Sequence, residues 1–269
     1  GQSDPALFTP NGIALTSDRR LLIANMGLDG GIWEVSRGSG IRRLLMEADG
    51  VSLYPANFVL CDSSGRIWIS VSTRQKPRDL AYNAMVCDGF VVLLDRKGAR
   101  IVADGLGYSN ECRLSNDEAY LHVNETFHRR GFPLPLRPPA KLGAPGAWCQ
   151  FGAGDFPDGG VFDSEGHYWV TSVISNRIYR VTPEGNPVRF LADEDDAYVA
   201  ECEAAFRQGA LNTGHLKRDF TTVLKHTSSI AFGGDDLRTA LVGTLGMDSV
   251  LAFRSPVAGR KPAHWEWEF

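Results

Sequence analysis

The sequence predicts an all-β protein, a β-propeller of four-stranded blades that forms a single domain over residues 1–269. The first observation is a turn-strand-turn-strand unit that recurs five times along the chain. The second is that β-branched and aromatic residues gather in short runs, with turn residues at intervals of about 8–12 positions. The third is a content of 29 Gly and 14 Pro, which suits many tight turns. Propellers of this length fold as one unit, so we expect no second domain.

The repeated unit begins with a turn and a short apolar strand, and a second strand with an aromatic or aliphatic centre follows. One polar residue just after the turn marks the register of each copy. These residues are Asn11, Asn57, Asn110, Asp158 and Ser228, spaced by 46, 53, 48 and 70 residues. The first three spacings are close to the length of a four-stranded blade, about 40–50 residues. The last spacing predicts an insert near residues 193–225.

Two copies carry an Asp-x-x-Gly turn between their first two strands. Asp62 and Asp163 open these turns, and we expect them to close the hairpins rather than to act in chemistry. Trp68 and Trp169 follow at the centre of the second strands, where we expect them to pack between neighbouring blades.

The insert is the part of the chain that departs from strand patterning. We expect a helix near residues 195–212, because an acidic run at 193–196 suits a helix start and Gly209 suits its end. Five residues of mainly apolar character fall on one helical face: Tyr198, Val199, Cys202, Ala205 and Phe206. An amphipathic helix on a long loop is expected to lie across the mouth of the propeller.

Composition excludes several classes of function. The formal net charge is -4 and no long block of Lys and Arg is present, so nucleic acid is not an expected partner. Apolar runs such as residues 90–94 are far shorter than the roughly 20 residues that span a bilayer, and no signal pattern opens the chain, so we expect a cytoplasmic protein without a membrane partner. The five cysteines are scattered and predict reduced, mostly buried thiols. Oligomeric state is left open.

The register residues predict a site at the propeller axis. The first strand of each blade lines the axis, so side chains at its start point toward one place. A single Asn or Asp beside Gly or Pro is an ordinary turn residue, but recurrence in phase indicates a shared role for Asn57, Asn110 and Asp158, whereas a turn role and a site role are equally open for Asn11. Amide and carboxylate oxygens gathered in this way would hold a hard cation such as Ca²⁺ or Mg²⁺.

Three stretches carry a family resemblance: residues 156–170, residues 108–110 and residues 226–234. Together with the phased repeats from about Pro10 to Pro256, they resemble the SMP-30/gluconolactonase family. The resemblance implies a six-bladed propeller and metal-dependent hydrolysis of a sugar lactone, a small-molecule substrate. It also implies one divalent cation, with Ca²⁺ the first expectation and Zn²⁺, Mn²⁺ or Mg²⁺ as alternatives.

The resemblance assigns roles at matching positions. It implies that Asn57, Asn110 and Asp158 hold the metal, that Asp158 helps water attack the lactone carbonyl, and that Asn57 also lies beside the substrate. From their own positions near the starts of inner strands, Asn11, Tyr108 and His226 are predicted to contact substrate as well.

The chain departs from the family pattern at one ligand. The family's Glu lies in a Gly-Glu-Gly-Pro-like turn, which this sequence lacks, and five repeats stand where the family has six. Either a further N-terminal blade supplies that Glu or another residue such as Asn11 replaces it; alternation along the strand argues against Glu111. The alternatives to a sugar lactonase are a propeller esterase or lactonase with another substrate, and a non-catalytic small-molecule-binding propeller.

Overall fold

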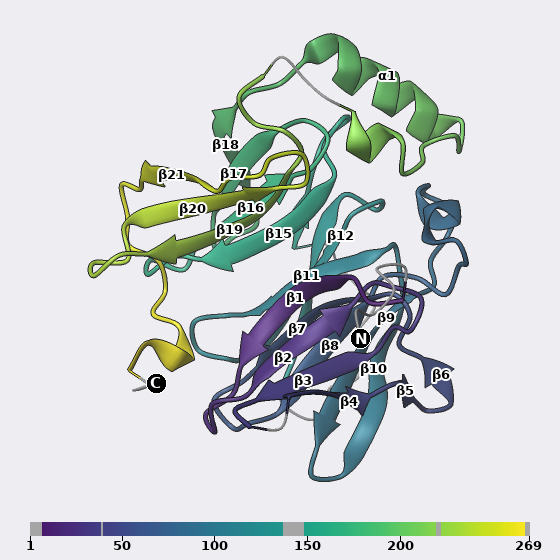
Figure 1. Ribbon diagram of the computed structural model, residues 1–269. Helices are drawn as coiled ribbons and strands as arrows, with labels where there is room; N and C mark the ends of the chain where they lie inside the picture. Colours follow the sequence, from purple (N-terminus) through teal and green to yellow (C-terminus); the bar gives the residue numbers. More distant parts are fainter. Residues whose placement is uncertain (1–6, 39, 137–147, 219–221, 267–269) are drawn as a thin grey trace.

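The computed structural model describes residues 7–38, 40–136, 148–218 and 222–266. Within these ranges the chain forms five antiparallel sheets that follow one another around a β-propeller (Figure 1). The first four sheets have four strands each, as predicted, and the fifth has three. Each of the five sequence repeats therefore forms one blade.

The strands have the following bounds. Blade one contains β1 (Pro10–Leu15), β2 (Leu21–Asn25), β3 (Ile32–Ser36) and β4 (Gly40–Leu45), followed by a small hairpin of β5 (Glu47–Ala48) and β6 (Val51–Ser52). Blade two contains β7 (Ala56–Cys61), β8 (Ile67–Val71), β9 (Gly89–Asp95) and β10 (Gly98–Leu106). Blade three contains β11 (Ser109–Leu114), β12 (Tyr120–Glu125), β13 (Arg130–Pro135) and β14 (Cys149–Gln150). Blade four contains β15 (Pro157–Phe162), β16 (Tyr168–Ser172), β17 (Arg177–Val181) and β18 (Pro187–Ala192). Blade five contains β19 (Thr227–Gly233), β20 (Thr239–Thr244) and β21 (Leu251–Arg254).

The first strand of every blade is the innermost one. β1 packs on β7, β7 on β11, β11 on β15 and β15 on β19, so these strands line the axis. The hydrophobic core lies between successive blades rather than at one centre. Trp68 packs with Cys112 and Val123 between blades two and three, and Trp169 packs with Ile230 and Phe232 between blades four and five. Both tryptophans have the predicted interblade position.

The two Asp-x-x-Gly turns close their hairpins by the same set of hydrogen bonds. Asp62 Oδ1 accepts from the backbone N–H groups of Ser64 and Arg66, each at 2.9 Å, and Asp62 Oδ2 accepts from Trp68 Nε1 at 2.9 Å. Asp163 makes the equivalent bonds, including one from Trp169 Nε1 at 2.9 Å. These carboxylates are fully used in holding the hairpins, as the sequence predicted.

The insert folds as a helix, α1 (Asp196–Arg207), followed by a single 3₁₀ turn, η2 (His215–Lys217). The Asp195 side chain caps the helix by accepting from the Tyr198 N–H at 3.0 Å. Tyr198, Val199 and Cys202 are buried on one face, and Ala205 and Phe206 pack against the same cluster, as predicted. Figure 1 shows α1 (green) at one end of the sheets. The expected insert also includes residues 219–221, which lie outside the described residues.

Two further 3₁₀ segments complete the described structure: η1 (Arg78–Ala81) in the loop between β8 and β9, and η3 (Ala263–Glu266) near the C-terminus. The segment before η3 passes along the face opposite the starts of the inner strands. There Ser164 N donates to Ala258 O at 2.9 Å, and Arg260 Nη1 donates to Leu114 O at 2.8 Å. These bonds tie blades three and four together at that face.

The first and last blades leave apolar side chains uncovered. Ile13 of β1 is 59% exposed and Leu241 of β20 is 37% exposed, whereas their neighbours Ala14 and Val242 pack toward the adjoining blade. The family resemblance implied six blades, and the described residues form five. A sixth blade is therefore not part of the described structure.

The cysteines and the helix lengths concern the expected buried thiols and the expected lack of a membrane span. Cys112, Cys149 and Cys202 are buried free thiols, Cys61 is half-buried and Cys87 is exposed. Within the described ranges, no helix is both long enough and apolar enough to cross a bilayer.

Candidate active site

The five register residues occupy one structural position. Asn11, Asn57, Asn110, Asp158 and Ser228 are each the second residue of an innermost strand. In every blade the pairing with the next strand slips across this residue, for example between Ala56 and Phe58 and between Pro157 and Gly160. Such a bulge frees the residue from the ladder and re-aims its side chain. We define the face where these bulges lie as the mouth.

Asn57 and Asn11 meet across the contact between the first two blades. Asn11 Nδ2 donates to the Asn57 backbone carbonyl at 2.8 Å and lies 3.4 Å from Asn57 Oδ1. Asn57 Nδ2 donates to Ser72 Oγ at 3.0 Å, and the Asn57 side chain is only 2% exposed. Because Ser72 fixes the amide nitrogen, Asn57 Oδ1 is left as the acceptor of this side chain.

Asn110 is held by an equivalent device in the next blade. Its Nδ2 donates to Thr126 Oγ1 at 3.0 Å, and Thr126 in turn donates to the Pro157 carbonyl at 2.8 Å. Thr126 directly follows β12 just as Ser72 directly follows β8, so one hydroxyl per blade orients each amide. The chain therefore presents two oriented amide oxygens from neighbouring inner strands.

Asp158 is the carboxylate of this group. Its backbone carbonyl accepts from Asn124 Nδ2 at 2.7 Å, and its side chain is a hydrogen-bonding neighbour of Asn110. Burial raises the pKa of Asp158 well above its usual range, and the nearby Glu111 carboxylate adds to the rise, while Asn110 and Arg78 oppose it. In the described part of the chain no Lys or Arg forms an ion pair with Asp158. The site therefore holds a carboxylate whose charge is not compensated by the protein.

Glu111 follows Asn110 but belongs to a different environment. Its carboxylate pairs with Arg113 Nη2 at 2.8 Å and accepts from the Gly160 N–H at 3.3 Å. Burial raises the pKa of Glu111, and the Arg113 charge opposes that rise. Glu111 is thus engaged between blades three and four, in keeping with the argument from strand alternation.

The donor set at the mouth fits a hard divalent cation. Asn57 and Asn110 offer amide oxygens, and Asp158 offers a carboxylate whose raised pKa marks an uncompensated negative charge. Ca²⁺ takes six to eight oxygen ligands, so three protein donors would leave positions for water and substrate.

A second acidic group lies at the opposite face and does not share these properties. It consists of Asp163, Glu165 and His167, whose possible ligand atoms all lie within 4.8 Å of one another. Both Asp163 oxygens are already occupied, because Oδ1 accepts from two backbone N–H groups and Oδ2 accepts from Trp169 and Arg180. This group is the hairpin closure described above.

Tyr108 belongs to an aromatic wall beside the site. Its ring lies 5.3 Å from Tyr82 and 5.0 Å from Phe127, in both cases edge to face. Burial, followed by the neighbouring Tyr82, raises the pKa of the Tyr108 hydroxyl well above its usual range, so this group stays a neutral hydrogen-bonding group. Tyr54 lies on the same side, with Lys76 Nζ 4.8 Å above its ring.

His226 has both ring nitrogens directed at backbone carbonyls. Nδ1 lies 3.1 Å from Val173 O and Nε2 lies 3.1 Å from Arg218 O, and the residue is fully buried. Burial lowers the pKa of His226 despite these acceptors. This geometry connects the insert to blade four and does not support the predicted contact with substrate.

The insert covers part of the mouth. Its buried face packs on Phe127, Phe156 and Tyr108, which lie beside the register residues. Glu203 of α1 pairs with Arg129 at 2.6 Å and accepts from the Gly154 N–H at 2.9 Å, and Thr213 donates to Asp79 of η1 at 2.6 Å. The insert is therefore held to blades two and three and to the loop that leads into blade four.

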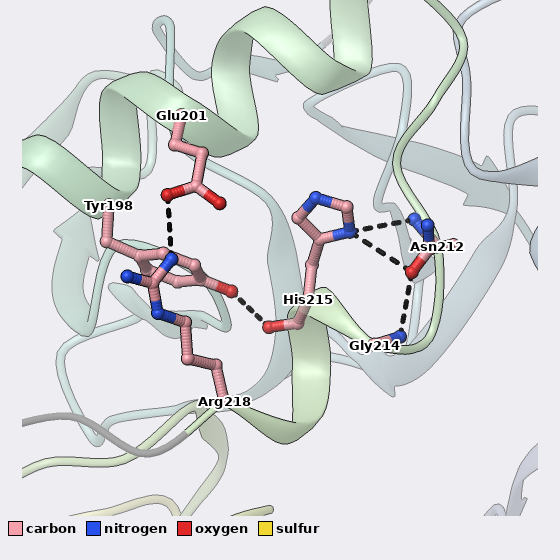
Figure 2. A pocket seen from close by; sticks show the side chains of 6 residues that line it. All are labelled: Tyr198, Glu201, Asn212, Gly214, His215 and Arg218. Carbon is pink, nitrogen blue, oxygen red and sulfur yellow. Dashed lines mark hydrogen bonds and ion pairs between the residues drawn. The ribbon is translucent and has the colours of Figure 1, made fainter.

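A separate hollow of about 180 Å³ lies on the insert itself (Figure 2). It is lined by Tyr198, Glu201, Asn212, Gly214, His215 and Arg218. Arg218 pairs with Glu201 at 2.7 Å, and the Tyr198 hydroxyl donates to the His215 carbonyl. Because its charged groups neutralise one another and the register residues do not line it, we do not assign the active site to this hollow.

Sequence reasoning missed three residues at the mouth. Ser72 and Thr126 orient the two amides, and Arg78 of η1 lies within electrostatic range of Asp158. The position directly after each second strand is a signal that could have identified the two hydroxyls. Arg78 belongs to an irregular loop, and no repeat marks it.

The fold and the phased polar ring define a propeller of the gluconolactonase type, and a family comparison agrees. Residues 6–192 match the SMP-30/Gluconolactonase/LRE-like region, which is more than half of the chain. The chain therefore belongs to the SMP-30/gluconolactonase/LRE-like family.

Among curated proteins, the chain is similar to a 6-deoxy-6-sulfogluconolactonase of Pseudomonas putida. The two are 26% identical over 184 residues, which is 67% of this chain and 50% of the relative. The chain thus spans about half the length of that relative.

Solved structures of similar fold include a putative gluconolactonase, with a TM-score of 0.66 at 16% identity over 94% of this chain and 76% of that one. A calcium-binding regucalcin of Agrobacterium tumefaciens gives a TM-score of 0.64 at 19% identity, over 95% and 78% of the two chains. A gluconolactonase of Xanthomonas campestris gives 0.63 at 17% identity, over 87% and 69%. At these identities the likeness concerns the fold.

Proposed function

We propose that this protein hydrolyses a sugar lactone at the mouth of the propeller, with a divalent cation bound there. The observation that carries the proposal is Asp158, a carboxylate with a raised pKa and no ion-pair partner in the described ranges, placed beside the oriented amide of Asn110. The family and the names of its lactonase relatives support the reaction class.

Asn57, Asn110 and Asp158 would hold the cation through three oxygen donors. Ca²⁺ is the first candidate for this all-oxygen set, and Mg²⁺, Mn²⁺ or Zn²⁺ are alternatives. When bound, such a cation acts as a Lewis acid that polarises the lactone carbonyl.

Asp158 is proposed as the general base. Its carboxylate takes one proton from the attacking water while the water oxygen bonds to the carbonyl carbon. The ring C–O bond then breaks, and the proton passes to the departing oxygen, so the product is a hydroxy acid. The bond between Asn124 and the Asp158 carbonyl keeps the Asp158 backbone in place.

Asn57, Asn11 and Tyr108 are proposed to contact the sugar. Asn11 and Asn57 touch each other at the mouth, and Tyr108 lies in the aromatic wall next to it. His226, whose nitrogens face Val173 and Arg218, is proposed to position the insert instead.

The test measures the hydrolysis of aldonolactones through the protons that the reaction releases. It is run with metal-free protein and again after each cation has been added. We expect activity to disappear with chelator and to return with one cation, and Asp158→Asn to lower kcat by about 10²- to 10⁴-fold. Asp235→Asn, an exposed carboxylate in the β19–β20 turn, is the matched control. Retention of more than a tenth of kcat by folded Asp158→Asn would exclude Asp158 as the base.

A binding-only propeller is the second candidate. The observation in its favour is that Asp158 is the one carboxylate of the proposed ligand set, since Glu111 is engaged by Arg113 and Gly160. Saturable binding of cation and lactone without turnover would identify this alternative.

A further inference from the structure

Arg78 is a partly buried cation that has no anionic partner among the described residues. It begins η1, in the loop that leads from β8 to β9 on the mouth side. The structure describes only two half-buried arginines that form no ion pair, Arg78 and Arg238, and Arg238 donates instead to the Pro256 carbonyl. Removing a guanidinium from water without a counter-charge is unfavourable, so the position of Arg78 indicates a functional role for its charge.

Three blades surround this guanidinium. Arg78 Nη1 lies 3.4 Å from Met26 Sδ, just after β2. Its charge interacts with the Tyr108, Tyr82 and Tyr54 hydroxyls, and Tyr82 is also a hydrogen-bonding neighbour. Burial alone would lower the pKa of Arg78, but these hydroxyls outweigh it and the pKa is raised, so the group stays cationic.

The same cation lies close to the proposed reaction centre. Arg78 lowers the pKa of Asp158 electrostatically, yet the two side chains form no ion pair in the described structure. A positive and a negative group thus lie within electrostatic range of each other on the mouth side of the fold. Lys76, exposed beside the Tyr54 ring, adds a second positive charge at the rim.

We propose that Arg78 binds an anionic group of the substrate, so that the substrates are sugar lactones carrying a second acidic group, a carboxylate or a sulfonate, away from the lactone carbonyl. This inference rests on the proposed lactone hydrolysis. The planar guanidinium can donate two parallel hydrogen bonds to either kind of oxyanion, and the tyrosine hydroxyls can donate to it as well. A neutral sugar would leave the cation desolvated and unpaired.

The experiment compares three substrates: D-glucono-1,5-lactone, a hexonolactone with a C6 carboxylate, and one with a C6 sulfonate. We expect Arg78→Gln to lower kcat/KM for one or both acidic lactones by about 10- to 100-fold, mainly through KM, and to change the neutral lactone less than about threefold. The matched control is Arg74→Gln in the same loop, because Arg74 is neutralised by Asp104 at 2.8 Å. The ratio between the two acidic arms tells which oxyanion fits.

Equal losses on neutral and acidic lactones would overturn the inference, as would hydrolysis of gluconolactone alone by the wild type. If the wild type hydrolyses none of the three, the proposed function fails, and calorimetry with the open-chain C6-sulfonated and C6-carboxylated acids still tests the site. Binding of either acid that Arg78→Gln weakens about tenfold supports an anion site without turnover. Absence of binding to the wild type rejects it.

Discussion

His122 should make the stability of this protein fall between pH 7.5 and pH 5. The side chain lies on β12 between blades three and four and is 8% exposed. Its ring centroid is 4.6 Å from that of Trp148 and 5.0 Å from that of Phe162. Across the described residues its Nδ1 has no hydrogen-bond partner. Burial in this aromatic cluster lowers the pKa of His122 to about 4, and the nearby Asp117 charge opposes this shift.

The size of the effect follows from linkage. The unfolded chain has a histidine pKa of about 6.5, so it binds the proton more tightly than the folded protein does. The stabilising contribution of neutral His122 is therefore complete above pH 6.5 and is lost as the pH falls toward about 4. Between these values the folded protein stays unprotonated while the unfolded chain gains a proton, which at pH 5 amounts to about 2 kcal/mol.

The variant His122→Phe removes the titrating nitrogen and keeps an aromatic ring in this aromatic cluster. Urea unfolding at pH 7.5 and pH 5 gives the free energy of unfolding for both proteins at each pH. We expect the wild type to lose about 2 kcal/mol more than the variant over this interval. Equal losses, within about 0.5 kcal/mol, would refute the argument from burial. Comparing two pH values cancels any change in packing that the larger ring introduces.

Three further predictions concern other parts of the molecule. Glu203→Gln breaks the bond to Arg129 at 2.6 Å, so amide hydrogen exchange in α1 should quicken by about tenfold while exchange in β16 stays unchanged; equal rates would show that apolar packing alone holds the helix. Cys87 Sγ lies 3.2 Å from His128 Nε2, and His128 Nδ1 lies 3.1 Å from a Glu125 carboxylate oxygen. Iodoacetamide should therefore label Cys87 before the other thiols, and His128→Gln should slow the labelling of Cys87. Asp163→Asn removes the carboxylate that pairs with Arg180 at 2.9 Å and should cost about 3 kcal/mol in urea unfolding, whereas an unchanged midpoint would show that its neutral hydrogen bonds suffice.

The part of the site that repeats could be predicted from the sequence. The sequence shows one polar residue at the same point of each repeat: Asn11, Asn57, Asn110, Asp158 and Ser228. The structure explains this recurrence, because each of these residues lies in a bulge at the second position of an inner strand. Blades are copies of one unit, so a side chain that the unit re-aims toward the axis recurs at the blade spacing. The Asp-x-x-Gly hairpins and the interblade tryptophans belong to the same repeated unit and are predictable for the same reason.

The part that depends on contacts between distant segments could not be predicted. Ser72, Thr126 and Arg78 act through neighbours that a strand pattern does not specify: two hydroxyls orient amides, and a loop arginine lies near an aspartate 80 residues further along. His226 shows the reverse case. Its position at the start of an inner strand suggested a ligand contact, but the insert covers it and both nitrogens face carbonyls.

The electrostatics of the mouth follow from these placements. Burial and the Glu111 carboxylate raise the pKa of Asp158, and Arg78 is a partly buried cation. In the described structure Asp158 and Arg78 form no ion pair with each other. Opposite charges that lie near each other in a low-dielectric region would gain by pairing, so leaving both unpaired costs stability in the free protein. Such a cost is offset when a ligand supplies both counter-charges, a cation for Asp158 and an anion for Arg78. An acidic sugar lactone bound together with a divalent cation meets both requirements at once, whereas either component alone neutralises only half of the site.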